Sequence, residues 1–175
     1  SCIIATGSKA IMLDHLYNNN SNIIGSKEAL ELNKIPKKML IIGGGYIGLE
    51  LGSVYNSLGT NITIAEFFPN LLSMADQDLV EVLYKKLDSE FADIYLSTEV
   101  TKLESKNNKV TATLKNNNKK IIETFDCVLV CVGRTPNTSA LSLDKAGIRV
   151  TKRGFIPVNK KMRTNIPNIY AIGDV

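Results

Sequence analysis

Three glycines and one acid are the residues whose types and spacing predict a specific chemistry in this sequence. Gly43, Gly45 and Gly48 form a G-x-G-x-x-G pattern, and Glu66 follows 18 positions after the last of them. A glycine turn of this kind lets backbone N–H groups approach a pyrophosphate, and an acid about 20 residues later accepts hydrogen bonds from ribose hydroxyls. The pattern therefore predicts a binding site for a dinucleotide.

The elements around the pattern are those that such a site requires. Residues 39–42 are a short apolar run typical of a buried parallel strand, and residues 47–58 carry apolar residues at helical spacing. A second apolar run, residues 62–65, leads directly to Glu66. Dinucleotide-binding folds place a strand, a glycine turn, a helix and a second strand in this order, whereas three glycines without it would indicate only a turn.

Each glycine has a separate task in this interpretation. Gly43 lets the chain turn tightly out of the strand, Gly45 leaves room for the pyrophosphate, and Gly48 lets the helix pack closely on the strand. The helix begins at the turn, so its free N–H groups and its positive dipole end face the phosphates. A carboxylate at Glu66 would repel a 2′-phosphate and no arginine follows it closely, so the sequence favours NAD over NADP.

Composition excludes several other classes of protein. The 175 residues suffice for one domain, alone or with attached pieces, and a hydrophobic content of 44% supports a sizeable core. The net charge of +4 is mild and no basic stripe alternates with aromatic residues, so nucleic acid is not a predicted partner. No apolar run reaches the roughly 18 residues of a membrane span, and no signal peptide is visible. The chain begins at Ser1 and stops at Val175 directly after an apolar run, which predicts a piece of a longer protein.

The cysteines and the single histidine predict no metal site and no redox pair. Cys2, Cys127 and Cys131 lie in apolar runs and no C-x-x-C is present, so we expect small buried residues. Cys127 and Cys131 are four positions apart, which places them on the same side of a strand. His15 lies near an Asn-rich stretch and is expected in a loop.

The rest of the chain alternates between helical and strand-like patterns. The polar segment 14–26 predicts a loop, and residues 26–30 predict a short helix capped by Ser26. Residues 76–91 predict a longer helix with Asp76 at its start. The apolar stripe of this helix consists of Leu79, Val80, Leu83 and Leu87.

Beyond residue 94 the apolar period changes to that of strands. Residues 100–103, 110–114 and 121–125 are short β-type runs separated by Asn-rich turns, which predicts an antiparallel three-stranded meander in place of a crossover helix. Residues 127–132 predict a buried strand that is a parallel neighbour of residues 39–42 and 62–65. Three further strands are predicted at residues 2–5, 155–158 and 169–172. The predicted fold class is α/β: a doubly wound, Rossmann-like domain with a parallel sheet and an added meander.

With these pieces in order, the chain resembles the pyridine nucleotide–disulfide oxidoreductases, and among them most resembles the dihydrolipoyl dehydrogenases. The matching stretches are ATGS (5–8), GGGYIGLELGSVY (43–55), STEVT (97–101), VGRTPN (132–137) and RTNIPNIYAIGDV (163–175). They extend over nearly the whole chain. Glutathione, mercuric and other reductases share the glycine pattern and the Gly-Asp ending, so a related NAD-linked reductase is the alternative.

The resemblance implies that the glycine loop and the start of the following helix bind NAD. The residues it assigns there are Gly43, Gly44, Gly45, Tyr46, Ile47, Gly48, Leu49 and Glu50. Tyr46 and Ile47 would lie where the nicotinamide meets the flavin, and Glu50 would approach the carboxamide and ribose. An ordinary exposed acid is the other interpretation of Glu50.

Three more NAD contacts are implied further along the chain. Glu66 would hold the adenosine ribose, Val100 would pack on the adenine, and Gly133 would let the cofactor pass close to a strand end. Val100 as a plain core residue is the alternative. Arg134 would either contact the cofactor or cap a loop.

The two ends of the chain would belong to an FAD-binding domain. Thr6, Gly7 and Ser8 would lie in it, and Asp174 would accept a hydrogen bond from a ribityl or nearby hydroxyl of FAD, unless it is a plain turn residue. The implied division assigns residues 1–34 to the end of the FAD domain and a linker, 35–150 to the NAD domain, and 151–175 to a return into the FAD domain.

The implied parent enzyme oxidises dihydrolipoamide through a disulfide and FAD and passes hydride to NAD. It would be a homodimer serving the lipoamide-bearing subunits of 2-oxo acid dehydrogenase complexes, in a bacterial cytoplasm or a mitochondrial matrix. The family's redox-active C-x-x-x-x-C pair and C-terminal His-Glu pair are not among these residues. No catalytic residue is therefore assigned, and the isolated chain is expected to be inactive. A non-catalytic NAD-binding module is the alternative of a different class.

Overall fold

The computed structural model describes residues 1–13, 16, 20–31, 33–117 and 119–175. The chain divides into two compact units: residues 12–133 form one, and residues 1–11 together with residues 134–175 form the other. The division predicted at residues 35 and 151 separates regions by the cofactor that they would bind, and not by their internal contacts. The assignment of NAD-binding and FAD-binding domains stays a prediction. His15 lies outside the described residues.

A five-stranded parallel sheet forms the centre of the unit of residues 12–133. Its strands, in spatial order, are β3 (Ile23–Ile24), β10 (Cys127–Val130), β4 (Lys38–Ile42), β5 (Asn61–Ala65) and β6 (Asp93–Tyr95). The last four residues of β4 and of β5 are buried, as expected of apolar strands covered on both faces. The prediction that residues 39–42, 62–65 and 127–132 are parallel neighbours is confirmed, with β10 ending at Val130.

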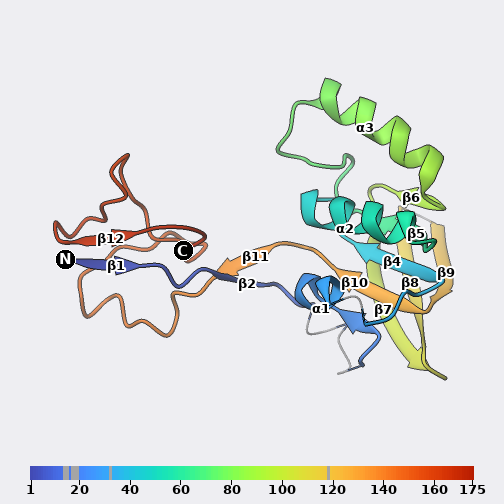
Figure 1. Ribbon diagram of the computed structural model, residues 1–175, viewed down its shortest axis with the longest axis horizontal. Coiled ribbons are helices and arrows are strands. Elements are labelled where there is room, and N and C mark those ends of the chain that lie inside the picture. The colour runs from blue at the N-terminus through green and yellow to red at the C-terminus, as the bar shows by residue number, and fades with distance from the viewer. Residues whose placement is uncertain (14–15, 17–19, 32, 118) are drawn as a thin grey trace. The chain divides into compact units, whose positions relative to one another are not determined.

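Helices cover one face of this sheet. They are α1 (Ser26–Leu30), α2 (Tyr46–Ser57) and α3 (Gln77–Glu90), and Figure 1 shows α2 and α3 on the same side of β4 and β5. The strand residues that face the helices are Met39, Ile41, Ile62, Ile64 and Leu129. Tyr55 of α2 is buried among them, and its hydroxyl donates to the carbonyl of Ala29 in α1 at 2.7 Å.

An antiparallel meander covers the other face. It consists of β7 (Glu99–Lys106), β8 (Lys109–Asn116) and β9 (Lys119–Phe125). The buried residues that join it to the parallel sheet include Leu40, Val128, Val110, Ala112 and Leu114. Asn107 and Asn108 connect β7 to β8 with φ values of 51° and 59°, the conformation that a two-residue hairpin favours. The predicted meander is confirmed.

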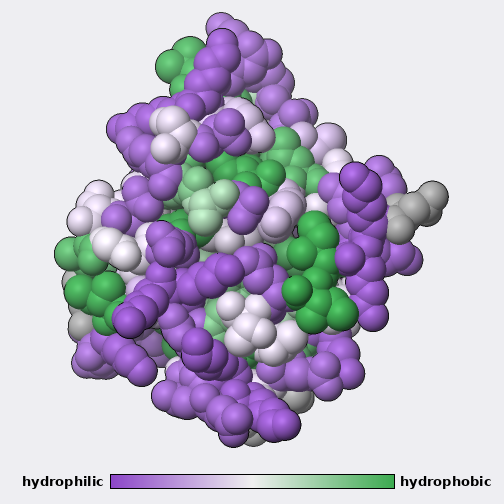
Figure 2. All heavy atoms as spheres, turned by 90° about the vertical axis from the view of Figure 1, so that its right-hand side faces the viewer, coloured by the Kyte–Doolittle hydropathy of each residue, from purple (hydrophilic) through white to green (hydrophobic). Residues whose placement is uncertain are grey.

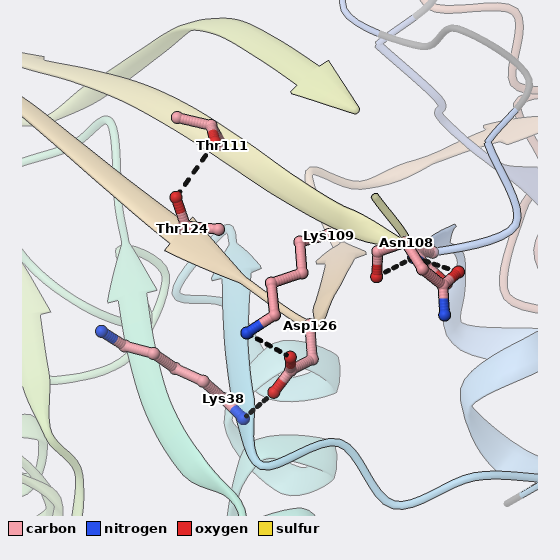
Figure 3. A network of polar contacts seen from close by, with 7 residues as sticks. Lys38, Asn108, Lys109, Thr111, Thr124 and Asp126 are labelled. Carbon is pink, nitrogen blue, oxygen red and sulfur yellow. Dashed lines mark hydrogen bonds and ion pairs between the residues drawn. The ribbon is translucent and has the colours of Figure 1, made fainter. Parts of the chain in front are cut away.

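A polar network anchors the meander to the parallel sheet where β9 passes into β10 (Figure 3). Asp126 accepts the backbone N–H of Lys38 at 3.0 Å and pairs with the Lys109 ammonium at 3.4 Å. Burial raises the pKa of the Asp126 carboxyl, but the N–H of Lys38 and the charge of Lys109 outweigh it, so this pKa lies below its ordinary value. Lys38 also pairs with Glu123 and lies over the ring of Phe125. These contacts fix where the antiparallel chain enters the parallel sheet.

The unit of residues 1–11 and 134–175 contains two short strand pairs. The parallel pair is β1 (Cys2–Ile4) with β12 (Ile169–Ala171), and the antiparallel pair is β2 (Ser8–Ala10) with β11 (Arg134–Pro136). Its core consists of Leu143, Ile148, Ile156, Ala171 and Val175. The strands predicted at residues 2–5 and 169–172 are confirmed, whereas β2 and β11 have no clear apolar pattern and are found only in the structure.

Three local predictions are wrong. Residues 155–158 form no strand, because Ile156 bonds to the Val175 carbonyl without continuing a ladder. Gly25, and not Ser26, caps α1, since the Glu28 carboxylate reaches back to the N–H of Gly25 at 2.9 Å. Residues 23–24, inside the predicted loop, become the edge strand β3 by pairing with β10.

Two apolar residues expected in the interior are exposed. Leu79 of the predicted stripe on α3 is 66% exposed, because Val80 and Leu87 define the side that packs on the sheet. Cys2 is exposed in the two-stranded pair of β1 and β12. Figure 2 shows a mainly hydrophilic face on which hydrophobic residues form several separate areas.

Candidate functional site

The glycine pattern lies where β4 ends and α2 begins, at the carboxyl edge of the parallel sheet. The N–H of Gly43 donates to the carbonyl of Ala65 at 2.9 Å, and the N–H of Cys131 donates to that of Ile42 at 2.8 Å. These bonds draw the ends of β4, β5 and β10 together. Ligands of open α/β sheets bind outside the carboxyl ends of the strands, so the fold presents residues 43–48 where a ligand is expected.

The three glycines of the pattern have different surroundings. A Cβ on Gly43, whose φ is 108°, would lie 2.4 Å from the carbonyl oxygen of Cys131. A Cβ on Gly48 would lie 2.4 Å from the carbonyl oxygen of Gly43. A Cβ on Gly45 would meet nothing within 4 Å, and its φ of −80° is open to any residue. Packing therefore requires Gly43 and Gly48, whereas the space beside Gly45 is open to a ligand.

Helix α2 begins at this open space. Gly45 is its N-cap, and its carbonyl accepts the N–H of Leu49 at 3.1 Å. The N–H groups of Tyr46, Ile47 and Gly48 therefore have no partner within the helix. The first turn contains no acid that would neutralise the positive end of the dipole. Such a helix start favours a phosphate or another anion.

Glu66 has a structural task besides the predicted one. Its buried carboxylate accepts the N–H of Gly44 through Oε2 and the N–H of Phe68 through Oε1, the latter at 2.7 Å. Its own backbone is fixed by Tyr95 and Thr98, each at 2.8 Å. The acid expected to hold a ribose thus also clamps the glycine loop to the turn after β5. A carboxylate has about four acceptor positions, so these contacts are compatible with hydrogen bonds to ribose hydroxyls.

The other predicted NAD contacts lie around the same edge or in the core. Tyr46 and Glu50 are exposed on α2, whereas Leu49 is buried against the sheet. Val100 is buried among core residues of the meander, so its core role is observed and its contact to adenine stays a prediction. Gly133 is exposed just beyond β10, with a φ of 125°.

Cys127 begins β10 and Cys131 directly follows its last residue, and neither is suited to thiol chemistry. Cys127 and Cys131 both pack beside the helix-side core, on one side of the sheet as predicted. Burial raises the pKa of both thiols to about 11, helped at Cys127 by the Asp126 carboxylate, so both stay protonated at neutral pH. Within the described ranges, no group of three His, Cys, Asp or Glu side chains could hold a metal ion.

The residues predicted to contact FAD form a second cluster, in the unit of residues 1–11 and 134–175. The Ser8 hydroxyl donates to Oδ2 of Asp174 at 2.7 Å, although 166 positions separate them. Arg134 Nε donates to that hydroxyl at 2.6 Å. Thr6 and Asn137 hydrogen-bond each other through the Thr6 hydroxyl at 3.0 Å and the Asn137 amide at 2.9 Å. The cluster thus brings the two ends of the chain together.

Open space adjoins this cluster as well. A Cβ on Gly7 or on Gly173 would meet nothing within 4 Å. The free side of the Asp174 carboxylate and this space fit a hydroxyl-bearing cofactor, as the space at Gly45 fits a pyrophosphate.

Residues 1–175 match the family described as "Pyridine nucleotide-disulphide oxidoreductase". The chain belongs to this family. It is 41% identical over 175 residues to dihydrolipoyl dehydrogenase of Haemophilus influenzae and 43% identical over 176 residues to that of Vibrio cholerae. These alignments cover the whole chain and 36% and 37% of the relatives, so the chain spans little more than a third of their length.

A solved structure similar to this chain is that of the HOCl-induced flavoprotein disulfide reductase RclA from Escherichia coli. It matches with a TM-score of 0.84 at 29% identity, over 98% of this chain and 39% of that chain. The predicted family and fold class are confirmed.

Two contacts of this family member have no signal in the sequence pattern. The Asn137 amide that holds Thr6 lies in the family-like stretch 132–137, but nothing in its spacing assigns it a partner. The clamp between Glu66 and Gly44 joins residues that the pattern treats as separate binding elements. Both contacts depend on how distant segments meet, which only the structure gives.

Proposed function

We propose that this chain is the NAD-binding central region of a flavoprotein dihydrolipoyl dehydrogenase. The observation that carries the proposal is the open space at Gly45 before the start of α2, where packing does not require a glycine. Identity of 41% and 43% to two dihydrolipoyl dehydrogenases, along the whole chain, supports this subclass.

The chain's own residues would bind and orient the NAD. The backbone of Gly43, Gly44 and Gly45 and the first N–H groups of α2 would hold the pyrophosphate. Glu66 would accept the ribose hydroxyls and repel a 2′-phosphate, which selects NAD over NADP. Tyr46, Ile47 and Glu50 would lie towards the nicotinamide, with Val100 at the adenine and Gly133 at the strand end beside the cofactor.

The ends of the chain would complete an FAD site. Thr6, Gly7 and Ser8 would approach the cofactor, and Asp174 would accept one of its hydroxyls. FAD, when bound, would supply the electron transfer between a disulfide and NAD, while the protein supplies orientation and electrostatics. This proposal assigns residues 35–150 to NAD and residues 1–34 and 151–175 to the FAD domain with its linker.

The partners follow from the proposed reaction. The whole enzyme would be a homodimer that accepts electrons from lipoamide-bearing subunits of 2-oxo acid dehydrogenase complexes, in a bacterial cytoplasm or a mitochondrial matrix. No nucleic acid or membrane partner is proposed. Within the part of the chain that the structure describes, no helix has both the length and the apolar content to cross a membrane.

Another flavoprotein disulfide reductase is the second candidate, because the fold also matches RclA with a TM-score of 0.84. The two candidates differ in electron donor and acceptor. The test uses the full-length protein, purified with its flavin, and follows NAD reduction by dihydrolipoamide and, separately, the oxidation of NADH and NADPH by disulfides. Fast NAD reduction by dihydrolipoamide is the expected result.

Absence of that reaction, together with rapid oxidation of NADPH or NADH by another disulfide, would overturn the subclass. A full-length protein that binds NAD but neither contains flavin nor catalyses either reaction would instead be a non-catalytic module. The 175 residues alone are expected to show no dihydrolipoamide oxidation, since no vicinal thiol pair is among them.

A further inference from the structure

One guanidinium contacts both parts of the proposed FAD site. Arg134 Nε donates to the Ser8 hydroxyl at 2.6 Å and lies 3.4 Å from Oδ2 of Asp174. Its Nη2 donates to the backbone carbonyl of Ser8 at 2.8 Å. The pairing of β11 with β2 places Arg134 opposite Ala10, so the side chain reaches diagonally back to Ser8 on the neighbouring strand.

The direction of these hydrogen bonds is determined by the donors. A guanidinium has N–H donors and no acceptor, so the Ser8 oxygen must accept from Arg134. The single proton of Ser8 is then left for Oδ2 of Asp174, at 2.7 Å. Every contact to the Asp174 carboxylate from the described residues is on Oδ2, and none is on Oδ1. The side chain of Asp174 is 63% exposed, so Oδ1 is accessible.

We infer that Arg134 is a positioning residue, which holds Asp174 through Ser8 so that Oδ1 is presented to a hydroxyl of FAD. The inference rests on the proposed FAD site. A carboxylate fixed before binding loses less conformational freedom when the cofactor binds. The charge of Arg134 also balances Asp174 beside its bound oxygen. Lysine would supply a point charge without the planar fork that reaches both the hydroxyl and the carbonyl of Ser8.

The test compares FAD release from full-length flavoprotein variants. They are Arg134→Gln, Arg134→Lys, Ser8→Ala, Asp174→Asn and the double variant Arg134→Gln with Asp174→Asn. Arg163→Gln is the matched control, because this arginine of the same unit lies over Tyr170 and contacts no member of the cluster. The measurements are the rate of FAD release, followed by the rise in flavin fluorescence, and the visible absorbance of the bound flavin.

Arg134→Gln and Ser8→Ala should each release FAD on the order of tenfold faster, since each breaks a charge-assisted contact that holds Asp174. The Arg134→Lys variant should be intermediate and the Arg163→Gln control unchanged. In the Asp174→Asn background, Arg134→Gln should add little, because the residue through which it acts is already altered. If Arg134→Gln fails to fold, Ser8→Ala with Asp174→Asn provides the same comparison.

Two results would separate this inference from the proposed function. If the wild-type protein binds FAD and the effects of Arg134→Gln and Asp174→Asn multiply independently, Arg134 does not act through Asp174 and the inference is wrong. The same holds if Arg134→Gln only lowers the melting temperature of the apoprotein and leaves FAD release and absorbance unchanged. A wild-type protein without FAD would overturn the proposed function itself, and the inference with it.

Discussion

Replacing Gly45 with alanine distinguishes a binding loop from a simple turn. Gly45 has φ of −80° and ψ of 173°, and a Cβ there would meet nothing within 4 Å, so the folded chain accepts alanine without strain. Alanine is a poorer N-cap than glycine by about 0.5–1.5 kcal/mol. Removing a glycine from the unfolded chain stabilises the protein by about 0.4–1 kcal/mol. The free energy of unfolding should therefore change by less than about 1 kcal/mol.

The effect of Gly45→Ala on NAD should be much larger. The methyl group would occupy the space through which a pyrophosphate reaches the N–H groups at the start of α2, so affinity should fall at least about tenfold, or about 1.4 kcal/mol. Gly48→Ala is the matched control. Its Cβ would lie 2.4 Å from the Gly43 carbonyl oxygen, so this variant should lose about 1–3 kcal/mol of stability through overpacking.

The assay is stopped-flow absorbance of the two half-reactions in the full-length protein. In Gly45→Ala, dihydrolipoamide should still reduce the flavin, because that half-reaction does not use the NAD site. Reoxidation of the reduced enzyme by low concentrations of NAD should fail. Chemical unfolding of the same variant provides the stability measurement. Normal reoxidation at low NAD would refute the assignment of Gly45 to the pyrophosphate.

Three further substitutions test the surrounding structure. Glu66→Gln should weaken NAD binding and lessen the rejection of NADP, and unchanged calorimetric affinities would exclude Glu66 as the ribose acid. The same change should cost about 1–3 kcal/mol of stability, since one amide oxygen cannot accept the backbone N–H groups of both Gly44 and Phe68. Asp126→Asn should cost about 1 kcal/mol at neutral pH. Burial raises the pKa of the Asp126 carboxyl, but the N–H of Lys38 and the charge of Lys109 lower it more, so this pKa lies below its ordinary value. The difference should therefore shrink as the pH falls below about 4, and a pH-independent difference in unfolding free energy would contradict the ionic role. Thr63→Val should stabilise the protein by about 1 kcal/mol, because the buried Thr63 hydroxyl has no hydrogen-bond partner among the residues that the structure describes. A lower melting temperature would show that this hydroxyl is satisfied.

Much of the parallel sheet could be predicted because its strands are apolar runs that stop at strong turn signals. Residues 39–42 and 62–65 are buried on both faces, and the burial leaves a direct signature in composition. The edge strand β3 has no such signature. Only two of its residues pair, and they do so because β10 lies beside them. Tertiary contact, rather than local propensity, creates this strand.

Two corrections have similar physical causes. Helical periodicity selects Leu79 as well as Val80 for the buried side of α3, but the orientation of the helix on the sheet leaves Leu79 exposed. Ser26 has the residue type of a cap, yet the Glu28 carboxylate bonds the N–H of Gly25 and moves the helix start back by one position. In each case the sequence pattern predicts the helix, and contacts of that helix with nearby residues determine its orientation or its first residue.

The residues of the candidate site could be predicted from the sequence, but the hydrogen bonds between them could not. Spacing alone selects Gly43, Gly45, Gly48 and Glu66 as candidates, because phosphate and ribose recognition need those residue types at those separations. Spacing does not reveal that Glu66 holds the N–H of Gly44. A hydrogen bond between two motif residues depends on the turn after β5, whose conformation no periodicity specifies.

This connection determines how substitutions in the pattern must be interpreted. A Cβ on Gly43 or on Gly48 would lie 2.4 Å from a backbone carbonyl oxygen, so packing requires both glycines, and Glu66 is required by the loop that it clamps. Loss of NAD binding after a change at any of these three residues would therefore combine a damaged fold with a damaged site. Gly45 alone among the three pattern glycines has open space around it, so a change there would obstruct the proposed ligand and leave the packing intact. A substitution at Gly45 is consequently the test of whether the pattern binds a ligand. Substitutions at Gly43, Gly48 and Glu66 instead report mainly how much these residues contribute to the stability of the fold.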